Sequence, residues 1–459
     1  MKDLIVIGGG PGGYVAAIRA AQLGMSVCLV EKDSLGGTCL NRGCIPTKAY
    51  FQNAAVLRTL ARLGDYSVEG GEFSFDLAKA RERKNKIVGN LAAGVQQLLK
   101  ANHVQVISGE ATLKDAGTVV VGDEEIHGQK VLIATGSIPS IPPIPGAELP
   151  GVLTSDEMLD LDTPPRSLAI IGGGVIGMEF ACIFRSFGCE VTVLEFQPSI
   201  LGNVDQEILK RMGLYLRKQK ITLHTGTAVQ EISHQGDSWL VTATGKKGEL
   251  KIKADLVLVS TGRKPCTSGL DLDALGINCS DNGLIKVDDN YETSLPGVYA
   301  IGDVVGKMML AHVASEEGIA AVERMNGLSS NVDYEAVPSC IFTFPEISTV
   351  GLSEAEATSR GLDVKVGKFP FAANGKAMAM GETDGLVKVV ADGDDVIRGI
   401  HILGPHASDL IQEAAVIVRN KMKLTDVINT IHPHPTLGEA LHEAVMDAAG
   451  RAIHLASRH

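Results

Sequence analysis

The chain has 459 residues, of which 45% are hydrophobic and 21% charged, and this composition excludes a disordered or fibrous protein. Its 42 basic and 54 acidic residues give a net charge of −12 without any Lys/Arg run, so we expect no nucleic-acid partner. Because the chain has no uninterrupted run of about 18 apolar residues, we also expect no association with a membrane through a spanning helix.

The first predicted element is a short apolar strand, "LIVI", that runs directly into the glycine turn "GGGPGG". This start is too short and too rich in glycine for a signal peptide, which favours a cytoplasmic protein. Gly8, Gly10 and Gly13 form the pattern G-x-G-x-x-G, and Glu31 ends the next predicted strand, 23 residues after Gly8. In such βαβ units the glycines admit a pyrophosphate and the acid accepts hydrogen bonds from ribose hydroxyls. Residues 4–32 therefore predict one dinucleotide-binding unit.

A pair of cysteines follows this unit in "LGGTCLNRGCIPTKAY", which we interpret as a glycine-rich loop running into a helix. Cys44 lies at or next to the predicted helix N-terminus, where the helix dipole and Lys48 favour a thiolate. A low-pKa thiol beside an electron carrier suits a redox-active disulfide of Cys39 and Cys44. Half of a zinc site, with His432 and His434 as the nearest further ligands, and two inert buried thiols remain the alternatives.

A second copy of the dinucleotide unit occupies residues 168–196, after a proline-containing linker at 146–165. Gly172, Gly174 and Gly177 repeat the glycine pattern, and Glu195 again lies 23 residues after the first glycine. One G-x-G-x-x-G pattern is a weak signal, but two complete units with equal spacing predict two bound dinucleotides. The closing strands "VLIATGSIPS" (131–140) and "LVLVSTGRKP" (256–265) also match each other.

The sequence pattern changes near residue 336, after which strands, a hairpin and helices are predicted without a glycine motif for nucleotide binding. In this last part, "HPHPTLGEA" places His434 five residues before Glu439. Histidine can act as an acid and a base near neutral pH, and a carboxylate partner would orient the ring. Beside a candidate dithiol, we interpret this pair as the acid/base of thiol exchange.

These patterns predict an α/β protein with two Rossmann-like dinucleotide-binding domains and a C-terminal α+β domain. The expected domains cover residues 1–145 for the first dinucleotide, 146–268 for the second, 269–335 for a central domain that completes the first site, and 336–459 for the C-terminal α+β domain.

The motifs "GGGPGGYVAAIRAAQLG", "GGTCLNRGCIPTK", "ATGS", "GGGVIGMEF", "YAIGD", "MLAH" and "HPHPTLGE", in this order, resemble the flavoprotein disulfide reductases over essentially the whole chain. Within them, the chain is most similar to the dihydrolipoamide dehydrogenases, the E3 components of 2-oxo acid dehydrogenase complexes. The cysteine motif is the specific part of this resemblance, because all dinucleotide binders share the glycine motifs.

The resemblance implies that the first unit binds FAD and the second binds NAD. It implies the following cofactor-binding residues: Gly8, Gly10, Gly13, Glu31, Lys48, Ala111, Thr135, Gly136, Ser137, Asp303, Met309, Leu310, Ala311 and His312 for FAD, and Gly172, Gly174, Gly177, Glu195, Val229 and Gly262 for NAD, with Glu179 paired to Lys48 near the flavin ring. The residues favour NAD over NADP as well, because Glu195 would repel a 2′-phosphate and "VTVLEFQPSILG" offers no cation.

The resemblance also implies the catalytic roles. Cys44 is then the charge-transfer thiol that faces the flavin, Cys39 is the interchange thiol that attacks the substrate, and His434, held by Glu439, is the acid/base. In this family the histidine comes from the other subunit, so the resemblance implies a homodimer in which residues 336–459 form the dimerisation domain. The expected reaction is oxidation of dihydrolipoyl groups on a lipoyl-carrying protein of a 2-oxo acid dehydrogenase or glycine cleavage complex, with reduction of NAD+. Reduction of another disulfide, as in glutathione reductase, and a mainly structural docking role remain alternatives, and no resident metal is expected.

Overall fold

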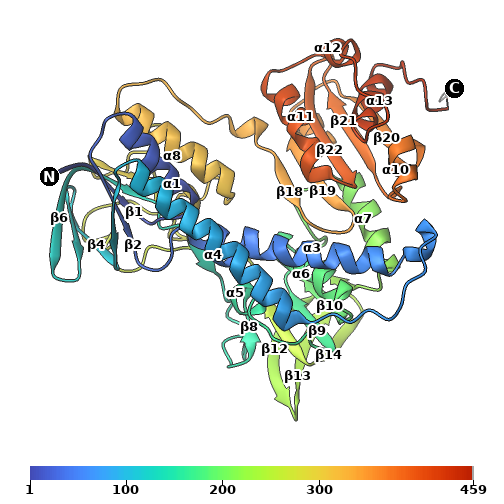
Figure 1. Cartoon of the computed structure of the whole chain (residues 1–459), viewed down its shortest axis with the longest axis horizontal. Helices are drawn as coiled ribbons and strands as arrows, with labels where there is room; N and C mark the ends of the chain where they lie inside the picture. The colour runs from blue at the N-terminus through green and yellow to red at the C-terminus, as the bar shows by residue number, and fades with distance from the viewer. Residues whose placement is uncertain (457–459) are drawn as a thin grey trace.

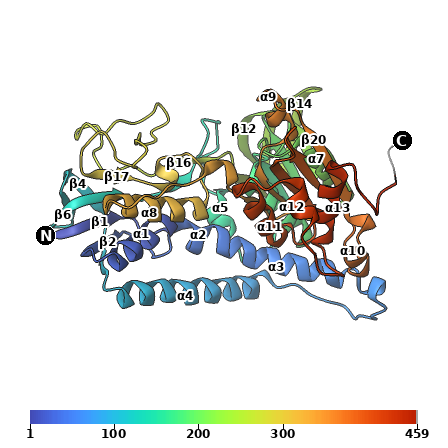
Figure 2. The same ribbon diagram turned by 90° about the horizontal axis from the view of Figure 1, so that it is seen from above.

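The computed structural model describes residues 1–456, and three bodies of mixed helix and sheet make up the fold (Figures 1 and 2). This confirms the predicted α/β class with two dinucleotide-type sheets and a C-terminal α+β part. Residues 457–459, the end of the expected interface domain, lie outside the described part of the chain. Within residues 1–456, no helix combines the length and apolar character needed to cross a membrane.

The first sheet has seven strands. Six of them follow the order β3-β2-β1-β6-β5-β4, and the seventh, β17, pairs with β6 outside this order. Strands β1, β2, β3, β6 and β17 are parallel, and β4 and β5 extend the sheet as an antiparallel meander. The strands are β1 (Lys2–Ile7), β2 (Val27–Glu31), β3 (Gln105–Ser108), β4 (Ala111–Asp115), β5 (Thr118–Val121), β6 (Glu124–Ile133) and β17 (Val298–Ala300).

Three helices flank this first sheet, and two of them are far apart in the sequence. Helix α1 joins β1 to β2, and α8 packs along it although it follows by about three hundred residues (Figure 2). Helix α4 runs outside them. The helices are α1 (Pro11–Gln22), α4 (Leu77–Ala101) and α8 (Ala311–Met325). The segment around β17 and α8 therefore lies in the same body as the first glycine unit.

The second sheet repeats this topology with the order β11-β10-β9-β15-β8. All of its pairs are parallel, so its central strands are apolar and buried on both faces. An antiparallel sheet of β12, β13 and β14 extends this unit. Its elements are β8 (Val152–Leu153), α5 (Ser155–Met158), β9 (Ser167–Ile171), α6 (Val175–Ser186), β10 (Glu190–Glu195), α7 (Gln206–Lys218), β11 (Thr222–Thr225), β12 (Ala228–Gln235), β13 (Ser238–Gly245), β14 (Gly248–Ala254) and β15 (Leu256–Val259).

The C-terminal body is an antiparallel sheet in the order β18-β19-β22-β21-β20, with helices packed against it. The predicted hairpin is confirmed, since β21 pairs with β22. The elements are β18 (Ser339–Ile341), β19 (Glu346–Gly351), α9 (Glu354–Ser359), β20 (Lys365–Pro370), α10 (Gly375–Ala379), β21 (Leu386–Ala391), β22 (Ile397–Gly404), α11 (Ala407–Arg419), α12 (Leu424–Ile428) and α13 (Glu439–Ala448).

Buried contacts fix the C-terminal body against the rest of the chain. Lys388 of β21 lies 2.9 Å from Asp205, which caps α7, and these side chains are only 2% and 3% exposed. Phe51 of helix α3 (Cys44–Leu60) stacks on Phe344, with ring centroids 4.4 Å apart. Separating a buried ion pair leaves an uncompensated charge, so these contacts hold one arrangement of the three bodies around the site.

Candidate active site

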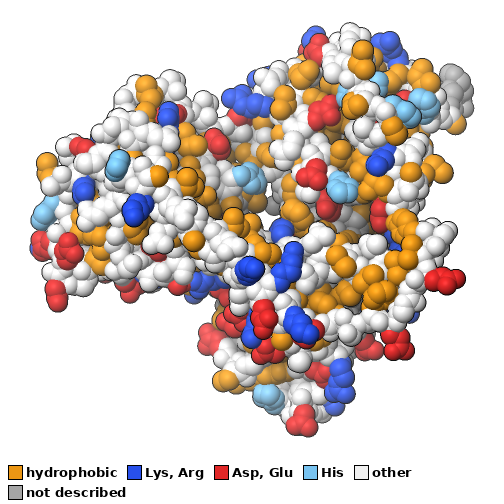
Figure 3. Space-filling model, in the orientation of Figure 1, with side chains coloured by type: hydrophobic (Ala, Val, Ile, Leu, Met, Phe, Trp, Pro, Cys, Tyr) orange, Lys and Arg blue, Asp and Glu red, His pale blue; other side chains and the backbone are white. Residues whose placement is uncertain are grey.

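One cavity of about 1720 Å³ joins the features that the sequence analysis singled out. Gly10 of the first glycine turn (residues 8–13), Gly174 of the second glycine turn (residues 172–177), Cys39 and Cys44 all line it. The surface is hollowed between the part that holds α1 and α8 and the part that holds α11 (Figure 3). The cavity is large enough for more than one drug-sized ligand, since typical single-ligand pockets measure about 300–1,000 Å³.

The first glycine turn has the geometry that its spacing predicts. Gly8 has φ +104°, and a Cβ there would lie 2.4 Å from the carbonyl oxygen of Ala134. A Cβ on Gly13 would lie 1.8 Å from the carbonyl oxygen of Gly8, so the third glycine allows α1 to pack on β1. The Glu31 carboxylate accepts hydrogen bonds from the backbone N–H groups of Gly9 (2.6 Å) and Asp33 (2.8 Å).

The second glycine turn repeats these contacts. Gly172 has φ +110°, with its hypothetical Cβ 2.4 Å from the carbonyl oxygen of Ser260. A Cβ on Gly177 would lie 2.1 Å from the carbonyl oxygen of Gly172. Glu195 accepts from the N–H groups of Gly173 (2.5 Å) and Gln197 (2.6 Å). Gly13 and Gly177 do not line the cavity, because each packs against its own turn, and they would act on a ligand only through the turn's shape.

Several features fit two dinucleotides in this cavity. Helices α1 and α6 begin at Gly10 and Gly174 without any side-chain cap, so their first N–H groups remain available to phosphate oxygens. A Cβ on Gly174 would meet nothing within 4 Å, which leaves open space at the start of α6. The Thr135 hydroxyl lines the cavity and is buried without a hydrogen-bond partner in the protein. Such an unpaired polar atom is costly unless a ligand satisfies it.

Alanine substitutions in the two turns should separate folding from binding. We expect Gly8→Ala to lower the thermal unfolding midpoint and to abolish retention of the first dinucleotide, because the methyl group would overlap a backbone carbonyl. Gly174→Ala should keep the wild-type unfolding midpoint but raise KM for the second dinucleotide, because its methyl group enters ligand space. Thermal unfolding and steady-state kinetics check both, and a destabilised Gly174→Ala variant would contradict this interpretation.

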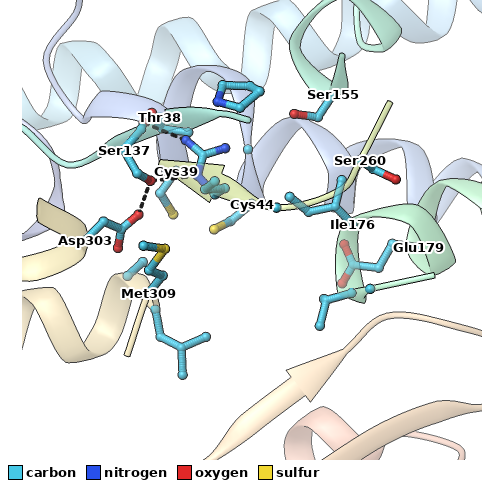
Figure 4. Close-up of a pocket in the computed structure, with 18 of the residues that line it drawn as sticks. Thr38, Cys39, Cys44, Ser137, Ser155, Ile176, Glu179, Ser260, Asp303 and Met309 are labelled. Carbon is cyan, nitrogen blue, oxygen red and sulfur yellow. Dashed lines mark hydrogen bonds between the residues drawn. The ribbon is translucent and has the colours of Figure 1, made fainter. Parts of the chain in front are cut away.

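The two cysteines lie on consecutive helices, not on a loop running into one helix as predicted. Helix α2 (Gly37–Arg42) contains Cys39, and α3 begins at Cys44 after Gly43. The short helix forms because Gly36 and Gly37 turn the chain at positive φ. Its structure is held further by the Asn41 amide, which donates to the carbonyl oxygen of Gly37 at 2.9 Å. Both cysteines are free thiols here, the reduced form of the predicted pair, and both sulfurs point into the cavity (Figure 4).

The pKa values of the two thiols are shifted in opposite directions. A hydrogen bond from the Cys39 thiol lowers the pKa of Cys44 to about 7; burial and Glu179 oppose the shift, and the positive charge of Lys48 adds to it. The same hydrogen bond, together with burial, raises the pKa of Cys39. In reduced protein Cys44 therefore loses its proton before Cys39 does, which is an arrangement suited to thiol–disulfide exchange.

Lys48 sits one turn after Cys44 and pairs with a buried carboxylate. Its ammonium lies 2.9 and 3.0 Å from the two carboxylate oxygens of Glu179, which is only 4% exposed. Glu179 also accepts from the backbone N–H of Phe342 at 3.0 Å, and the Lys48 ammonium lies 4.4 Å from the centroid of the Phe342 ring. The contact therefore joins α3, α6 and the end of β18 beside the cysteines.

The charges on Lys48 and Glu179 should shift the acidity of Cys44 in opposite directions. In reduced wild-type protein, alkylation of Cys44 by iodoacetamide should rise with pH through a midpoint near the pKa of about 7. Lys48→Met should move the midpoint to higher pH, and Glu179→Gln should move it to lower pH. Peptide mass spectrometry after timed alkylation measures each midpoint. Shifts of the same sign in both variants would contradict the electrostatic assignment.

Most of the other predicted cofactor residues line the same cavity. They are Gly8, Glu31, Thr135, Gly136, Ser137, Asp303, Met309, Leu310, Ala311 and His312 around the first turn, and Gly172, Glu195, Val229 and Gly262 around the second. The side chain of Ala111 does not line the cavity, and its assignment to the cofactor stays a prediction. Its side chain is 7% exposed and packs into the apolar core under β4 and β5.

His434 and Glu439 form the predicted pair, but they lie away from the cavity of the same chain. The Nδ1 atom of His434 is 2.9 Å from the Glu439 carboxylate, and the imidazole is 78% exposed. Neither residue lines the cavity, and α13, which begins at Glu439, lies well apart from α2 (Figure 2). A carboxylate-held, solvent-facing imidazole is free to act on a second subunit.

The sequence analysis missed Arg263, which donates to the Ser137 hydroxyl at 2.7 Å and lines the cavity. The signal was present, because Arg263 follows Thr-Gly in the second closing strand just as Ser137 does in the first.

The pyridine nucleotide-disulphide oxidoreductase family matches residues 2–318 of the chain, and the family's dimerisation domain matches residues 337–445. The dihydrolipoyl dehydrogenase of Bacillus subtilis is 44% identical over 471 residues, covering 98% of this chain and 99% of the relative. The dihydrolipoyl dehydrogenase of Chlamydia muridarum is 41% identical over 459 residues, covering 99% and 98%.

Solved structures agree with these relatives in fold. The crystal structure of LpdA from Mycobacterium tuberculosis has a TM-score of 0.89 and 28% identity, covering 96% of this chain and 99% of that one. The flavoprotein disulfide reductase RclA from Escherichia coli has a TM-score of 0.87 and 29% identity, covering 96% and 99%. Proteins of this family use FAD and NAD, for which the two glycine turns provide fitting sites. The chain therefore belongs to the pyridine nucleotide-disulphide oxidoreductase family, with dihydrolipoyl dehydrogenases as its full-length relatives.

Proposed function

We propose that the protein is a dihydrolipoyl dehydrogenase, which oxidises dihydrolipoyl groups on a carrier protein to the lipoyl disulfide and reduces NAD+ to NADH. The observation that carries this proposal is the Cys39 and Cys44 pair on the wall of one cavity that both glycine turns also line. A dithiol beside two dinucleotide sites is suited to moving electron pairs between a thiol substrate and a nicotinamide. Full-length relatives with the same activity support the substrate class.

The proposed exchange begins with the protein's cysteines joined as a disulfide. A dihydrolipoyl thiolate attacks the sulfur of Cys39, a mixed disulfide forms, and Cys44 leaves as a thiolate. The second dihydrolipoyl thiol then attacks the mixed disulfide, which releases the lipoyl disulfide and leaves Cys39 reduced. Two electrons and two protons pass from the substrate to the protein. FAD would be held at the first glycine turn and would supply the two-electron transfer between the dithiol and NAD+.

The residues assigned to this exchange act through acidity and position. The low pKa of Cys44 makes it a good leaving thiolate, and Lys48 supports its charge. We assign His434 as the base that removes the proton from the attacking thiol, with Glu439 orienting its ring. Because this imidazole is exposed and away from its own cavity, we propose that it serves the cysteines of the other subunit of a homodimer. The dimerisation-domain match supports that assembly.

We further propose the domain division 1–145, 146–268, 269–335 and 336–459, with FAD at the first glycine turn and NAD at the second. Glu195 favours NAD, since its carboxylate would repel the 2′-phosphate of NADP. The lipoyl-carrying protein of a 2-oxo acid dehydrogenase or glycine cleavage complex is the proposed partner.

A direct assay tests this function. Purified protein should oxidise dihydrolipoamide with NAD+, should act much less efficiently with NADP+, and should not reduce glutathione disulfide at a comparable kcat/KM. Preferred turnover of glutathione disulfide would favour the other reductase class. Absence of turnover with every disulfide, despite bound FAD, would favour a docking role.

A further inference from the structure

A two-stranded antiparallel ribbon connects the two dinucleotide units. Strand β7 (Ser137–Pro139) follows Thr135-Gly136 at the end of β6, and β16 (Arg263–Pro265) follows Thr261-Gly262 at the end of β15. The equivalent segments of the internal repeat therefore pair with each other. Backbone hydrogen bonds continue the pairing on either side, from Ser140 N–H to the Gly262 carbonyl (3.0 Å) and from Cys266 N–H to the Gly136 carbonyl (2.9 Å).

Arg263 crosses this ribbon and holds the residue at the equivalent position of the other repeat. Its Nε atom donates to the Ser137 hydroxyl at 2.7 Å, and its Nη2 atom donates to the Ser137 carbonyl oxygen at 2.7 Å. The Ser137 hydroxyl in turn donates to the Asp303 carboxylate at 2.5 Å (Figure 4). Ser137 is only 5% exposed, so water competes little for these bonds. The planar guanidinium makes both contacts at once, which a lysine could not do.

This chain of contacts runs from one dinucleotide site to the other. Gly262, next to Arg263, lines the part of the cavity assigned to NAD, and Ser137 and Asp303 line the part assigned to FAD. Asp303 has little freedom to move separately, because the neighbouring Gly302 N–H donates to the buried Glu317 carboxylate at 2.7 Å. A displacement of β16 would therefore disturb Ser137 and Asp303 together.

We propose that Arg263 is a positioning residue that couples occupancy of the NAD site to retention of FAD. The inference rests on the proposed function, which assigns the two dinucleotides to the two glycine turns. NAD+ bound beside Gly262 holds β16 in place. Arg263 then keeps Ser137, and through it Asp303, in position. Linkage is reciprocal, so bound FAD strengthens NAD+ binding by the same factor.

The test measures FAD release from the holoenzyme, by ultrafiltration or by the fluorescence of free FAD, with and without saturating NAD+. In the wild type, NAD+ should lower the FAD dissociation constant. In Arg263→Gln, FAD retention should weaken about tenfold, the size of one charge-assisted hydrogen bond, and NAD+ should no longer change it. With FAD added in excess, KM for NAD+ should rise while kcat for lipoamide turnover stays within about twofold, because the cysteines keep their surroundings.

Two further variants make the result specific. Lys264→Gln removes a neighbouring charge of the same ribbon. The side chain of Lys264 is exposed and does not line the cavity, so this variant should behave as wild type. Arg263→Lys keeps the charge but only one of the two hydrogen bonds to Ser137, so it should show part of the NAD+ effect. This variant also keeps the proposal testable if Arg263→Gln folds poorly. Identical behaviour of Arg263→Gln and Lys264→Gln, or an unchanged NAD+ effect in both Arg263 variants, would overturn the proposal.

Failure of the coupling is distinguishable from failure of the proposed function. Wild-type protein that turns over lipoamide normally but retains FAD equally with and without NAD+ would overturn the coupling alone. Wild-type protein that binds no FAD would overturn both.

Discussion

Replacement of Cys44 by serine should lower the rate of lipoamide turnover by at least about 10³-fold, while FAD stays bound. A serine hydroxyl cannot form the disulfide with Cys39, and its pKa is too high to supply a leaving group in exchange. The substitution changes one atom of a residue at the start of α3, so the glycine turns that hold the cofactor keep their shape. Steady-state assay of dihydrolipoamide oxidation, with FAD content read from the visible spectrum, measures both parts of the expectation.

Cys279→Ser is the matched control for this variant. Cys279 is partly exposed, lies outside the cavity, packs at the edge of an apolar core and has one weak hydrogen bond, at 3.9 Å, to the carbonyl oxygen of Ile277. The control should retain turnover within about twofold, as surface substitutions usually do. Substantial turnover in purified Cys44→Ser protein would contradict the dithiol relay, whatever the control does.

Replacement of His434 by alanine should lower lipoamide turnover by about 10²–10⁴-fold, the usual contribution of a general acid/base. Reduction of the flavin by NADH should change little, because that reaction needs no proton transfer at the substrate thiols. The expected signature is therefore a split between two half-reactions of one protein. Stopped-flow measurement of flavin reduction by NADH, beside steady-state lipoamide turnover, detects it.

The chain offers a matched histidine for comparison. His454 lies 2.6 Å from the Glu443 carboxylate and is 72% exposed, so it forms a histidine–glutamate pair much like that of His434 with Glu439. His454→Gln should leave both half-reactions near their wild-type rates. Equal losses of both half-reactions in His434→Ala would show that the residue supports the fold and not the proton transfer.

The proposed use of His434 across a dimer has a further consequence. Mixed dimers that combine a Cys44→Ser subunit with a His434→Ala subunit should regain one intact site, made of the cysteines of one chain and the histidine of the other. A mixed dimer with about one half of the activity of a wild-type dimer would support the shared site. Neither parent homodimer should show comparable turnover.

The two glycine turns could be predicted in detail from the sequence, because their geometry is local. The positive φ of Gly8 and Gly172, the close packing at Gly13 and Gly177, and the acids Glu31 and Glu195 all follow from spacing within a single βαβ unit. The start of α3 at Cys44 was predictable for the same reason, since Pro46 belongs in the first turn of a helix.

Features set by contacts between distant segments could not be predicted in this way. The short helix around Cys39 begins with a glycine, a poor helix former, so its residue propensities do not predict it. The contacts of Ser137 with Arg263 and with Asp303 join residues more than a hundred positions apart. The pairing of β7 with β16 brings Arg263 to Ser137.

Anaerobic titration with dihydrolipoamide shows whether Cys44 exchanges electrons directly with a flavin held at the first glycine turn. At one equivalent per subunit, a long-wavelength absorption band should appear, produced by the Cys44 thiolate lying against the oxidised flavin, and it should be absent from Cys44→Ser. Bleaching of the flavin without this band, or an unchanged spectrum after the substrate dithiol has been consumed, would contradict this exchange.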